Sequence, residues 1–210
     1  MKQNLPEEIP IFPLSGVIYF PKTNLPLNIF EERYLQLVND CMKTNKLMGM
    51  VQAKKNSSEV YNVGCLGKIS YSQKTEDGRM IIKLTGITRF EIIKEINNNK
   101  LYREFKVNYN RFNEDSNNLK LYALEEKKLK IFFEKIKLFF KKSGLLINWE
   151  EFERLEQMQQ ISTLAMISPF SDEEKQKLLE TVGINEIRKT LSKIIEFYIY
   201  NKNLNNTTIQ

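Results

Sequence analysis

Residues 61–92 read YNVGCLGKISYSQKTEDGRMIIKLTGITRFEI, and this stretch has a clean alternation of apolar residues that predicts a β-hairpin. Alternation with a period of two predicts a strand whose one face carries Tyr61, Val63, Cys65, Gly67, Ile69 and Tyr71. Asp77 and Gly78 suit the positive φ of a tight turn. The return strand is predicted to place on one face Met80, Ile82, Leu84, Gly86, Phe90 and Ile92. Gly86 favours a bulge or bend that curls the sheet, and Arg89 should point away from the face that Phe90 fills.

Shorter apolar runs on either side of this hairpin extend the predicted sheet. The run from Ile9 to Leu14 contains Pro10 and Pro13, which are typical of an edge or irregular strand. Further short strands are predicted over 25–29, 47–51 and 101–109. Between them, residues 31–43 change to helical spacing and begin with two acids, which the helix dipole favours. Several short curled strands with one helix predict a small closed or nearly closed barrel.

The chain changes character near residue 115, and its second half is predicted to be helical. A polar linker is expected over 113–118, and a frayed tail over 201–210. Apolar residues at helical spacing predict helices over 119–142, 148–165, 171–181 and 187–198. Capping signals support these bounds, namely Asn148 with Glu151, Ser171 with Glu174, and stops at Gly144 and Gly183. The sequence therefore predicts an α+β protein with a β domain at 1–115 and a helical bundle at 116–210.

The composition excludes several kinds of chemistry. The 210 residues include no histidine and two cysteines, which rules out Ser-His-Asp and Cys-His catalysis and histidine-ligated zinc. Cys65 lies in an alternating apolar run and is predicted to be a buried, inert thiol. The segment Gly67-Lys68-Ile69-Ser70 resembles the end of a phosphate loop, but Asn62 stands where the first glycine is required. No catalytic, metal-binding or cofactor-binding residue is therefore predicted, and the protein is not expected to be an enzyme.

The sequence also indicates where the protein works. No apolar run approaches the ~18 residues of a membrane span. The start, MKQNLPEEIP, contains acids and prolines instead of the apolar core of a signal peptide. We therefore expect a cytoplasmic protein that keeps its N-terminus and has no membrane partner.

Charge is distributed unevenly in the helical half. Residues 119–142 contain eight Lys and three Glu, whereas 150–180 contain eight acids and three bases. In one interpretation, these two stretches lie close and neutralise each other. In the other, a basic helix faces nucleic acid and its aromatic residues stack on bases, namely Phe132, Phe133, Phe139 and Phe140. The first is favoured, because these aromatics lie on the apolar stripe of the helix, where core packing involves them first.

A family resemblance appears in residues 9–38, IPIFPLSGVIYFPKTNLPLNIFEERYLQLV. The matching residues are Pro10, Phe12, Pro13, Leu14, Phe20, Pro21, Leu25, Pro26, Leu27, Ile29, Phe30, Glu31, Arg33 and Tyr34. They resemble the opening of the N-terminal substrate-binding domain of Lon proteases, the LON domain. The segments 63–69, 77–79 and 86–92 resemble its next strand and hairpin, and SPFSDEEKQKLLE at 168–180 resembles its helical extension.

The resemblance implies a PUA-like curled β-barrel with one helix, followed by an α-helical bundle. A full Lon protease continues into an ATPase module and a Ser-Lys protease module. This sequence contains no phosphate loop and no length for either module. The resemblance therefore implies a non-catalytic LON-domain protein that is neither an ATPase nor a protease.

The resemblance also implies a function, because in Lon this domain helps to recognise unfolded or damaged polypeptides. A proline-rich strand tends to lie at a sheet edge, where an extended peptide can add. The peptide-binding candidates are Phe20, Pro21, Phe30, Glu31, Glu32, Arg33 and Tyr34. The alternative is that the aromatic residues fill the barrel and that the charged ones are a solvated helix start.

Two other kinds of partner are alternatives to unfolded polypeptide. PUA-like barrels include RNA readers, but residues 1–118 contain 17 bases against 13 acids and no dense basic run, so nucleic acid is disfavoured. The other is one dedicated protein, for which this chain would be a structural subunit. The sequence does not separate a dedicated partner from general peptide capture.

Overall fold

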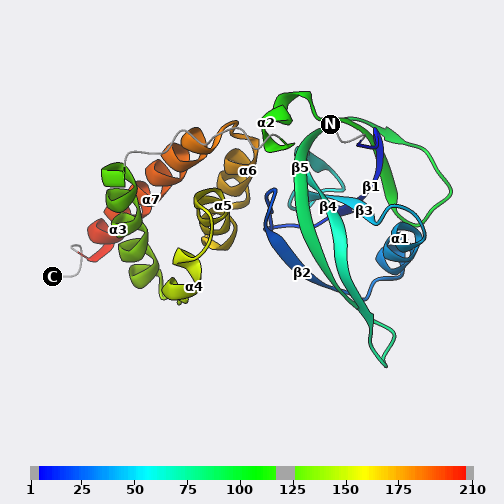
Figure 1. Ribbon diagram of the computed structural model, residues 1–210, viewed down its shortest axis with the longest axis horizontal. Coiled ribbons are helices and arrows are strands. Elements are labelled where there is room, and N and C mark those ends of the chain that lie inside the picture. The colour runs from blue at the N-terminus through cyan, green and yellow to red at the C-terminus, as the bar shows by residue number, and fades with distance from the viewer. Residues whose placement is uncertain (1–4, 117–125, 207–210) are drawn as a thin grey trace.

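The computed structural model describes residues 5–116 and 126–206, which form two lobes side by side (Figure 1). We call residues 5–116 the β lobe and residues 126–206 the helical lobe. The strands of the β lobe are β1 Glu8–Pro13, β2 Asn24–Ile29, β3 Leu47–Ala53, β4 Val60–Lys74, β5 Met80–Ile96 and β6 Arg103–Asn108. Its helices are α1 Glu32–Lys43, the 3-10 turn η1 Asn110–Phe112 and α2 Asn113–Ser116. The predicted α+β class is confirmed.

The six strands form one mixed sheet in the order β2-β5-β4-β3-β1-β6. A further pairing of β5 with β6 joins the far strand back to the long hairpin. The pairings therefore run in a closed ring from β5 through β4, β3, β1 and β6 back to β5, with β2 attached outside it. This ring is the hydrogen-bonding pattern that a small curled barrel requires.

For residues 9–14 the sequence predicted an edge or irregular strand, and the edge alternative was wrong, because β1 lies between β3 and β6. The two neighbours pair with different parts of β1, β6 with residues 8–11 and β3 with residues 11–13. At Pro10 only β6 is in register, and at Pro13 only β3 is. A missing backbone N–H is tolerated at both positions because only one ladder passes each proline.

A bulge at Ile87 divides β5 into two segments with opposite facings. Leu66 pairs with Thr88 and Gly67 with Gly86, so Ile87 is the extra residue, and the predicted bulge is confirmed. The extra residue inverts the alternation of side chains. The predicted single face over 80–92 was therefore wrong at Phe90, which packs in a different core cluster from Leu84.

The β lobe has apolar clusters on both sides of its strands. One cluster surrounds Phe90 and contains Ile9, Ile11, Val51, Leu66, Phe105 and Val107. The other lies under α1 and includes Phe12, Tyr34, Leu37, Val38, Met48, Met50, Ile82 and Leu84. Both faces of the middle of β4 are buried as a result, and the alternation predicted there is lost over residues 63–67.

The helices of the helical lobe are α3 Glu126–Ser143, α4 Trp149–Glu153, α5 Gln157–Ile167, α6 Asp172–Glu180 and α7 Ile184–Asn206. The capping box of Ser171 with Glu174 and the stop after Ser143 are confirmed. A continuous helix over 148–165 was wrong, because a second helix starts after Glu156, whose backbone N–H donates to the side chain of Gln159 (3.2 Å). A tail over 201–210 was wrong as far as Asn206, and 207–210 lie outside the described residues.

The predicted polar linker over 113–118 was also wrong where the structure describes it. Residues 113–116 form α2, and the Asp115 side chain is buried in an ion pair with Arg89. Residues 117–118, and the first part of the helix predicted over 119–142, lie outside the described residues.

The aromatic residues of α3 are core residues. Phe132, Phe139 and Phe140 are at most 2% exposed, which removes them as stacking partners for nucleic acid. Lys137 of basic α3 lies 3.4 Å from a carboxylate oxygen of Glu153 in acidic α4. This contact supports the interpretation that the basic and acidic stretches lie close together.

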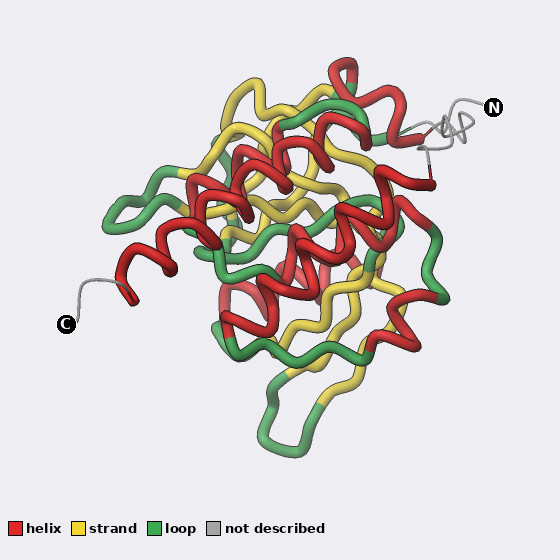
Figure 2. Tube along the Cα trace, turned by 90° about the vertical axis from the view of Figure 1, so that its left-hand side faces the viewer, coloured by secondary structure: helices red, strands yellow, loops and turns green. Residues whose placement is uncertain are grey.

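The two lobes share one apolar core. Seen from the side of the helical lobe, the helices lie across the strands (Figure 2). Four side chains of the β lobe belong to the core cluster of the helical lobe, namely Ile18, Phe20, Val63 and Phe112. The lobes therefore pack on each other through buried apolar surface and not through surface charges alone.

Buried polar groups connect the same junction. Arg89 donates to both carboxylate oxygens of Asp115 (2.8 and 2.7 Å) and to the carbonyls of Leu179 and Thr181 at the end of α6 (2.9 and 2.6 Å). Its guanidinium carbon also lies 4.4 Å from the ring centre of Phe112. Four hydrogen bonds and an aromatic face thus satisfy a charge that is almost fully buried.

Candidate functional site

Strands β2, β5 and β4 are neighbours in the sheet, and β4 and β5 form a long hairpin whose turn projects from the lobe (Figure 1). The register of the three strands defines rows of residues that share a face. The rows of the outer face are Asn24–Thr85–Lys68, Pro26–Lys83–Tyr71 and Asn28–Ile81–Gln73. Exposure follows this register, because the outer positions are exposed or half-buried whereas Ile29, Ile82 and Leu84 on the inner face are buried.

This outer face carries large apolar side chains that the core does not use. Tyr71 is 48% exposed and Ile81 is 42% exposed. Phe30 follows β2 directly and continues its alternation, since Ile29 is buried and Phe30 is 65% exposed. We call Phe30, Tyr71 and Ile81, with the outer rows, the outer face. Clustered exposed apolar side chains of this kind mark interaction surfaces.

The outer face ends at an edge strand. β2 pairs with β5 on one side, and no strand among the described residues pairs with its other side. Pro26 lies on this edge strand, as is usual for a proline within a sheet. The edge prediction made from the proline-rich segment thus fails for β1 and holds for β2.

The start of α1 borders the outer face next to Phe30. Arg33 pairs with Glu31 at 2.7 Å and stacks over the ring of Tyr34, 4.5 Å from its centre. Tyr34 is buried and packs on Phe12 with ring centres 4.4 Å apart. Burial raises the pKa of Tyr34. Its phenol therefore stays neutral at physiological pH.

The structure separates the seven candidate residues into two groups. Phe30, Glu31, Glu32 and Arg33 are exposed together at the end of β2 and the start of α1. Tyr34, Phe20 and Pro21 are buried, and Phe20 lies in the core cluster of the junction. The burial of Tyr34 and Phe20 agrees with the packing role given as the alternative, although Phe20 packs in the junction between the lobes and not in the barrel. The part of these residues in binding stays a prediction.

Two residues of the outer face were missed as candidates, Tyr71 and Ile81. Tyr71 was assigned to a face shared with core residues, and the bulge at Ser70 between Ile69 and Tyr71 reverses that assignment. Ile81 was identifiable, because it is an isoleucine at a position where the alternation of 80, 82 and 84 calls for a polar side chain.

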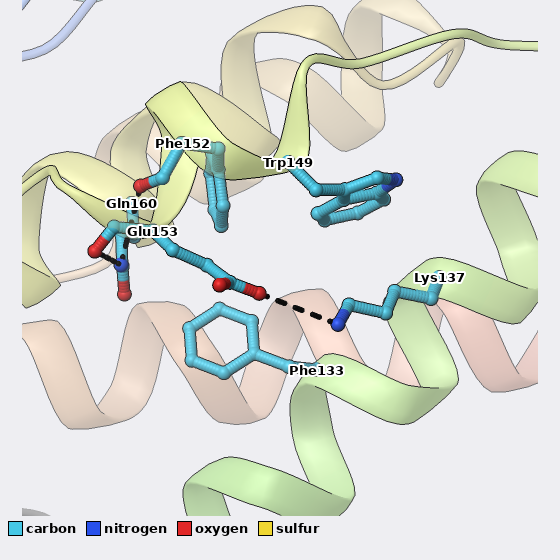
Figure 3. A pocket seen from close by; sticks show the side chains of 6 residues that line it. All are labelled: Phe133, Lys137, Trp149, Phe152, Glu153 and Gln160. Carbon is cyan, nitrogen blue, oxygen red and sulfur yellow. Dashed lines mark hydrogen bonds and ion pairs between the residues drawn. The ribbon is translucent and has the colours of Figure 1, made fainter.

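A small cavity lies in the helical lobe between α3, α4 and α5 (Figure 3). Its lining residues are Phe133, Lys137, Trp149, Phe152, Glu153 and Gln160. Lys137 Nζ lies 5.5 Å from the ring centre of Trp149. The cavity measures about 60 Å³, which is room for about two water molecules at ~30 Å³ each. It is too small for a nucleotide or another organic cofactor.

Two kinds of reactive group can be compared within the part of the chain that the structure describes, the metal-ligating side chains and the cysteine thiols. No three His, Cys, Asp or Glu side chains gather there as metal ligands. Burial raises the pKa of Cys41 to about 12, and it raises the pKa of Cys65 well above its usual value. Both thiols are therefore protonated and unreactive at neutral pH. No helix over 5–116 and 126–206 has the length and apolar character that crossing a membrane needs.

Parts of known Lon proteases are similar to this chain in sequence. The chain is 27% identical to the Lon protease of Syntrophus aciditrophicus over 205 residues, which is 91% of the chain and 25% of that protein. It is 30% identical to the Lon protease of Dictyoglomus thermophilum over 97 residues, which is 44% of the chain and 12% of that protein. The chain thus spans a quarter or less of the length of these relatives.

Two solved structures have the same fold. A Lon N-terminal domain protein from Xanthomonas campestris matches with a TM-score of 0.61 at 20% identity, over 90% of this chain and 97% of that one. The N-terminal domain of Lon protease from the Mycobacterium avium complex matches with a TM-score of 0.62 at 15% identity, over 90% and 98%. The family model of the ATP-dependent protease La (LON) substrate-binding domain matches residues 8–197. With nearly all of its described residues inside that match, the chain belongs to the LON substrate-binding domain family.

Proposed function

We propose that this chain binds exposed apolar segments of unfolded polypeptide along β2, without a chemical step of its own. The observation that carries the proposal is the edge strand β2 with three exposed apolar side chains on the same face, Phe30 directly after β2, Ile81 on β5 and Tyr71 on β4. The family supports polypeptide as the ligand, because its model is that of a substrate-binding domain. The role would be substrate recognition or an adaptor role related to Lon proteolysis.

The chemistry of the edge suits an unfolded chain. An extended peptide that adds to β2 forms hydrogen bonds through its backbone, so these bonds do not depend on its sequence. Side chains on one face of the added strand then lie beside Phe30 and the outer residues of β2, and Ile81 on β5 lies one strand further in. Burial of apolar area there contributes about 25 cal/mol per Å². Together the two effects select for apolar segments in extended conformation, which unfolded proteins expose and folded proteins do not.

The other sequence candidates fit this site in supporting roles. Glu31, Glu32 and Arg33 border the outer face at the Phe30 end and contact the flanks of a bound segment. Tyr34 fixes the start of α1 through its contact with Phe12. Phe20 and Pro21 hold the segment before β2 in the core.

The test is fluorescence anisotropy of a labelled, permanently unfolded polypeptide with the purified full chain. We expect saturable binding that the double variant Phe30→Ser with Ile81→Ser weakens about tenfold, the typical cost of losing an apolar anchor. The matched control is Leu146→Ser, because Leu146 is 99% exposed in the helical lobe. Equal affinities of the double variant and the wild type would refute this site.

The same assay separates peptide capture from RNA binding. Contacts with phosphates weaken steeply between about 50 and 200 mM salt, whereas apolar capture changes little. Unlabelled RNA added as a competitor should leave the anisotropy unchanged. Binding that salt or RNA abolishes would point to nucleic acid and contradict the proposed function.

A further inference from the structure

The outer face carries two lysines that have no ion-pair partner among the residues that the structure describes. Lys68 and Lys83 lie in its first two rows, and both are exposed. Within residues 5–116 and 126–206, neither lysine forms an ion pair. The other members of the three rows are neutral: Asn24, Pro26, Asn28, Tyr71, Gln73, Ile81 and Thr85.

Two of the acids nearest to this face in the sequence are compensated. Glu31 pairs with Arg33, and Asp77 at the hairpin turn is bound by Arg79 (2.6 Å). Glu32 beside Phe30 and Glu76 in the hairpin turn are exposed, and neither forms an ion pair within the residues that the structure describes. Charge is therefore unevenly distributed along the outer face, with lysines toward Asn24 and with apolar side chains and two acids toward Phe30.

Of the two lysines, Lys83 lies nearer to a strand added to β2, because Lys68 lies on β4, one strand further in. In its row it stands between Pro26 on the edge strand and Tyr71 on β4. A strand added to β2 would lie two strand spacings from β5, about 10 Å. Pro26 has a short, rigid side chain, and the long stem of Lys83 can extend across it toward the added strand.

We propose that Lys83 makes the surface selective for apolar segments that carry an Asp or Glu, with the carboxylate facing Lys83 and the apolar side chains on Ile81 and Phe30. This inference rests on the proposed function and names the peptide class that the site prefers. Lys83 and Ile81 are two residues apart on one face, which is about 7 Å along a strand. The preferred peptide therefore carries its acid two residues from a large apolar residue.

Peptide is favoured over RNA by the same geometry. The edge of β2 offers backbone hydrogen bonds that match a peptide, and a nucleic acid cannot complete a β-ladder. Two lysines are also few for a phosphate backbone, whose binding draws on several contacts at once. RNA is therefore an outcome that the experiment must be able to detect.

The experiment compares three labelled twelve-residue peptides that share the same apolar residues and differ at one position, which is Asp, Asn or Lys. With the full chain at about 50 mM salt, the Asp peptide should bind about threefold to fivefold more tightly than the Asn peptide, as expected for one exposed ion pair. The Lys peptide should bind more weakly than the Asn peptide. Raising the salt to about 200 mM should reduce these differences.

The charge reversal Lys83→Glu should invert the order, so that the Lys peptide binds best, while the Asn peptide keeps its affinity. The matched control is Lys94→Glu, which changes the same charge on β5 outside the three rows. Equal affinities for the three peptides, or an unchanged order in Lys83→Glu, would overturn the selectivity and leave peptide binding intact. Binding of none of the peptides, or their displacement by RNA, would overturn the proposed function as well.

Discussion

The two parts of strand β5 differ in their exposure to solvent. Its first part, before the bulge at Ile87, carries Ile81 and Lys83 on an exposed face. Its second part carries Arg89, which is buried in the junction between the lobes and satisfied by Asp115 and the end of α6. Within residues 5–116 and 126–206, Lys68 and Lys83 of the outer face form no ion pair. The contrast indicates that the junction stabilises the fold, whereas the outer face is exposed to solvent.

The largest effect should follow from breaking the junction. Arg89→Met leaves the Asp115 carboxylate buried without its partner, and such a change costs about 3–5 kcal/mol. Urea unfolding measures the loss. Arg103→Met is the matched control, because its pair with Glu95 is part-exposed and contributes at most about 1 kcal/mol.

The double variant Arg89→Met with Asp115→Leu sharpens this test. Removing both charges should restore part of the lost stability, because no buried charge remains unpaired. Arg89→Met unfolding within about 1 kcal/mol of wild type would mean that the buried pair does not hold the lobes together.

A smaller loss should follow from filling the close approach at the bulge. A Cβ on Gly86 would lie 2.1 Å from the carbonyl oxygen of Phe20, and backbone atoms cannot move aside cheaply. Gly86→Ala should therefore cost about 1–3 kcal/mol in free energy of unfolding, the usual range for overpacking. Gly78→Ala is the comparison variant in the hairpin turn. A Cβ on Gly78 would have no atom within 4 Å, so only the positive φ of this residue opposes the change. Equal stability of Gly86→Ala and wild type would contradict the close packing.

Alkaline pH should weaken the folded state through two tyrosines, Tyr102, which is buried, and Tyr198, which is half-buried. Burial raises the pKa of Tyr102 and of Tyr198 to about 12, from the ordinary value of 10.0. In the unfolded chain these phenols lose their protons at lower pH, so stability is complete below about pH 10 and falls as pH rises toward 12. Absorbance of the ionised phenol, recorded beside urea unfolding, checks this. Titration of every tyrosine near pH 10 in the folded protein would contradict it.

The smallest effect on stability is expected at the outer face. Phe30→Ser and Ile81→Ser remove side chains that are 65% and 42% exposed. Each should change the free energy of unfolding by no more than about 0.5 kcal/mol. A loss above 2 kcal/mol, measured in urea, would show that these side chains serve the core and not a ligand.

The sequence predicted the elements of the β lobe well because alternation and turn residues are local signals. It failed where a single residue changes the register, since the bulge at Ile87 puts Phe90 opposite to the assigned face. It failed also at Pro10 and Pro13, whose tolerance depends on how far β3 and β6 overlap β1. Such overlap is set by the tertiary structure and leaves no mark in the local pattern.

The candidate site shows the same limit. The sequence placed Phe30 and the start of α1 among the candidates, because a family motif and a proline-rich strand lie together there, and the structure exposes both. It offered burial of Phe20 in the barrel as an alternative, but it could not show that Phe20 is buried in the junction, since the helical lobe that covers it lies more than a hundred residues further along the chain. The partners of Arg89 are likewise distant, Asp115 by 26 positions and Thr181 by 92.

The place of Arg89 between the lobes has a consequence for synthesis. The ribosome releases Asp115 before Thr181, and the 66 residues between them take about 3–13 s at ~5–20 residues per second. During that interval Arg89 can pair with Asp115, but its bonds to the end of α6 do not yet exist. Ile18, Phe20, Val63 and Phe112 face water for the same seconds. Until the helical lobe has been synthesised, the β lobe therefore lacks the neighbours that bury these four side chains.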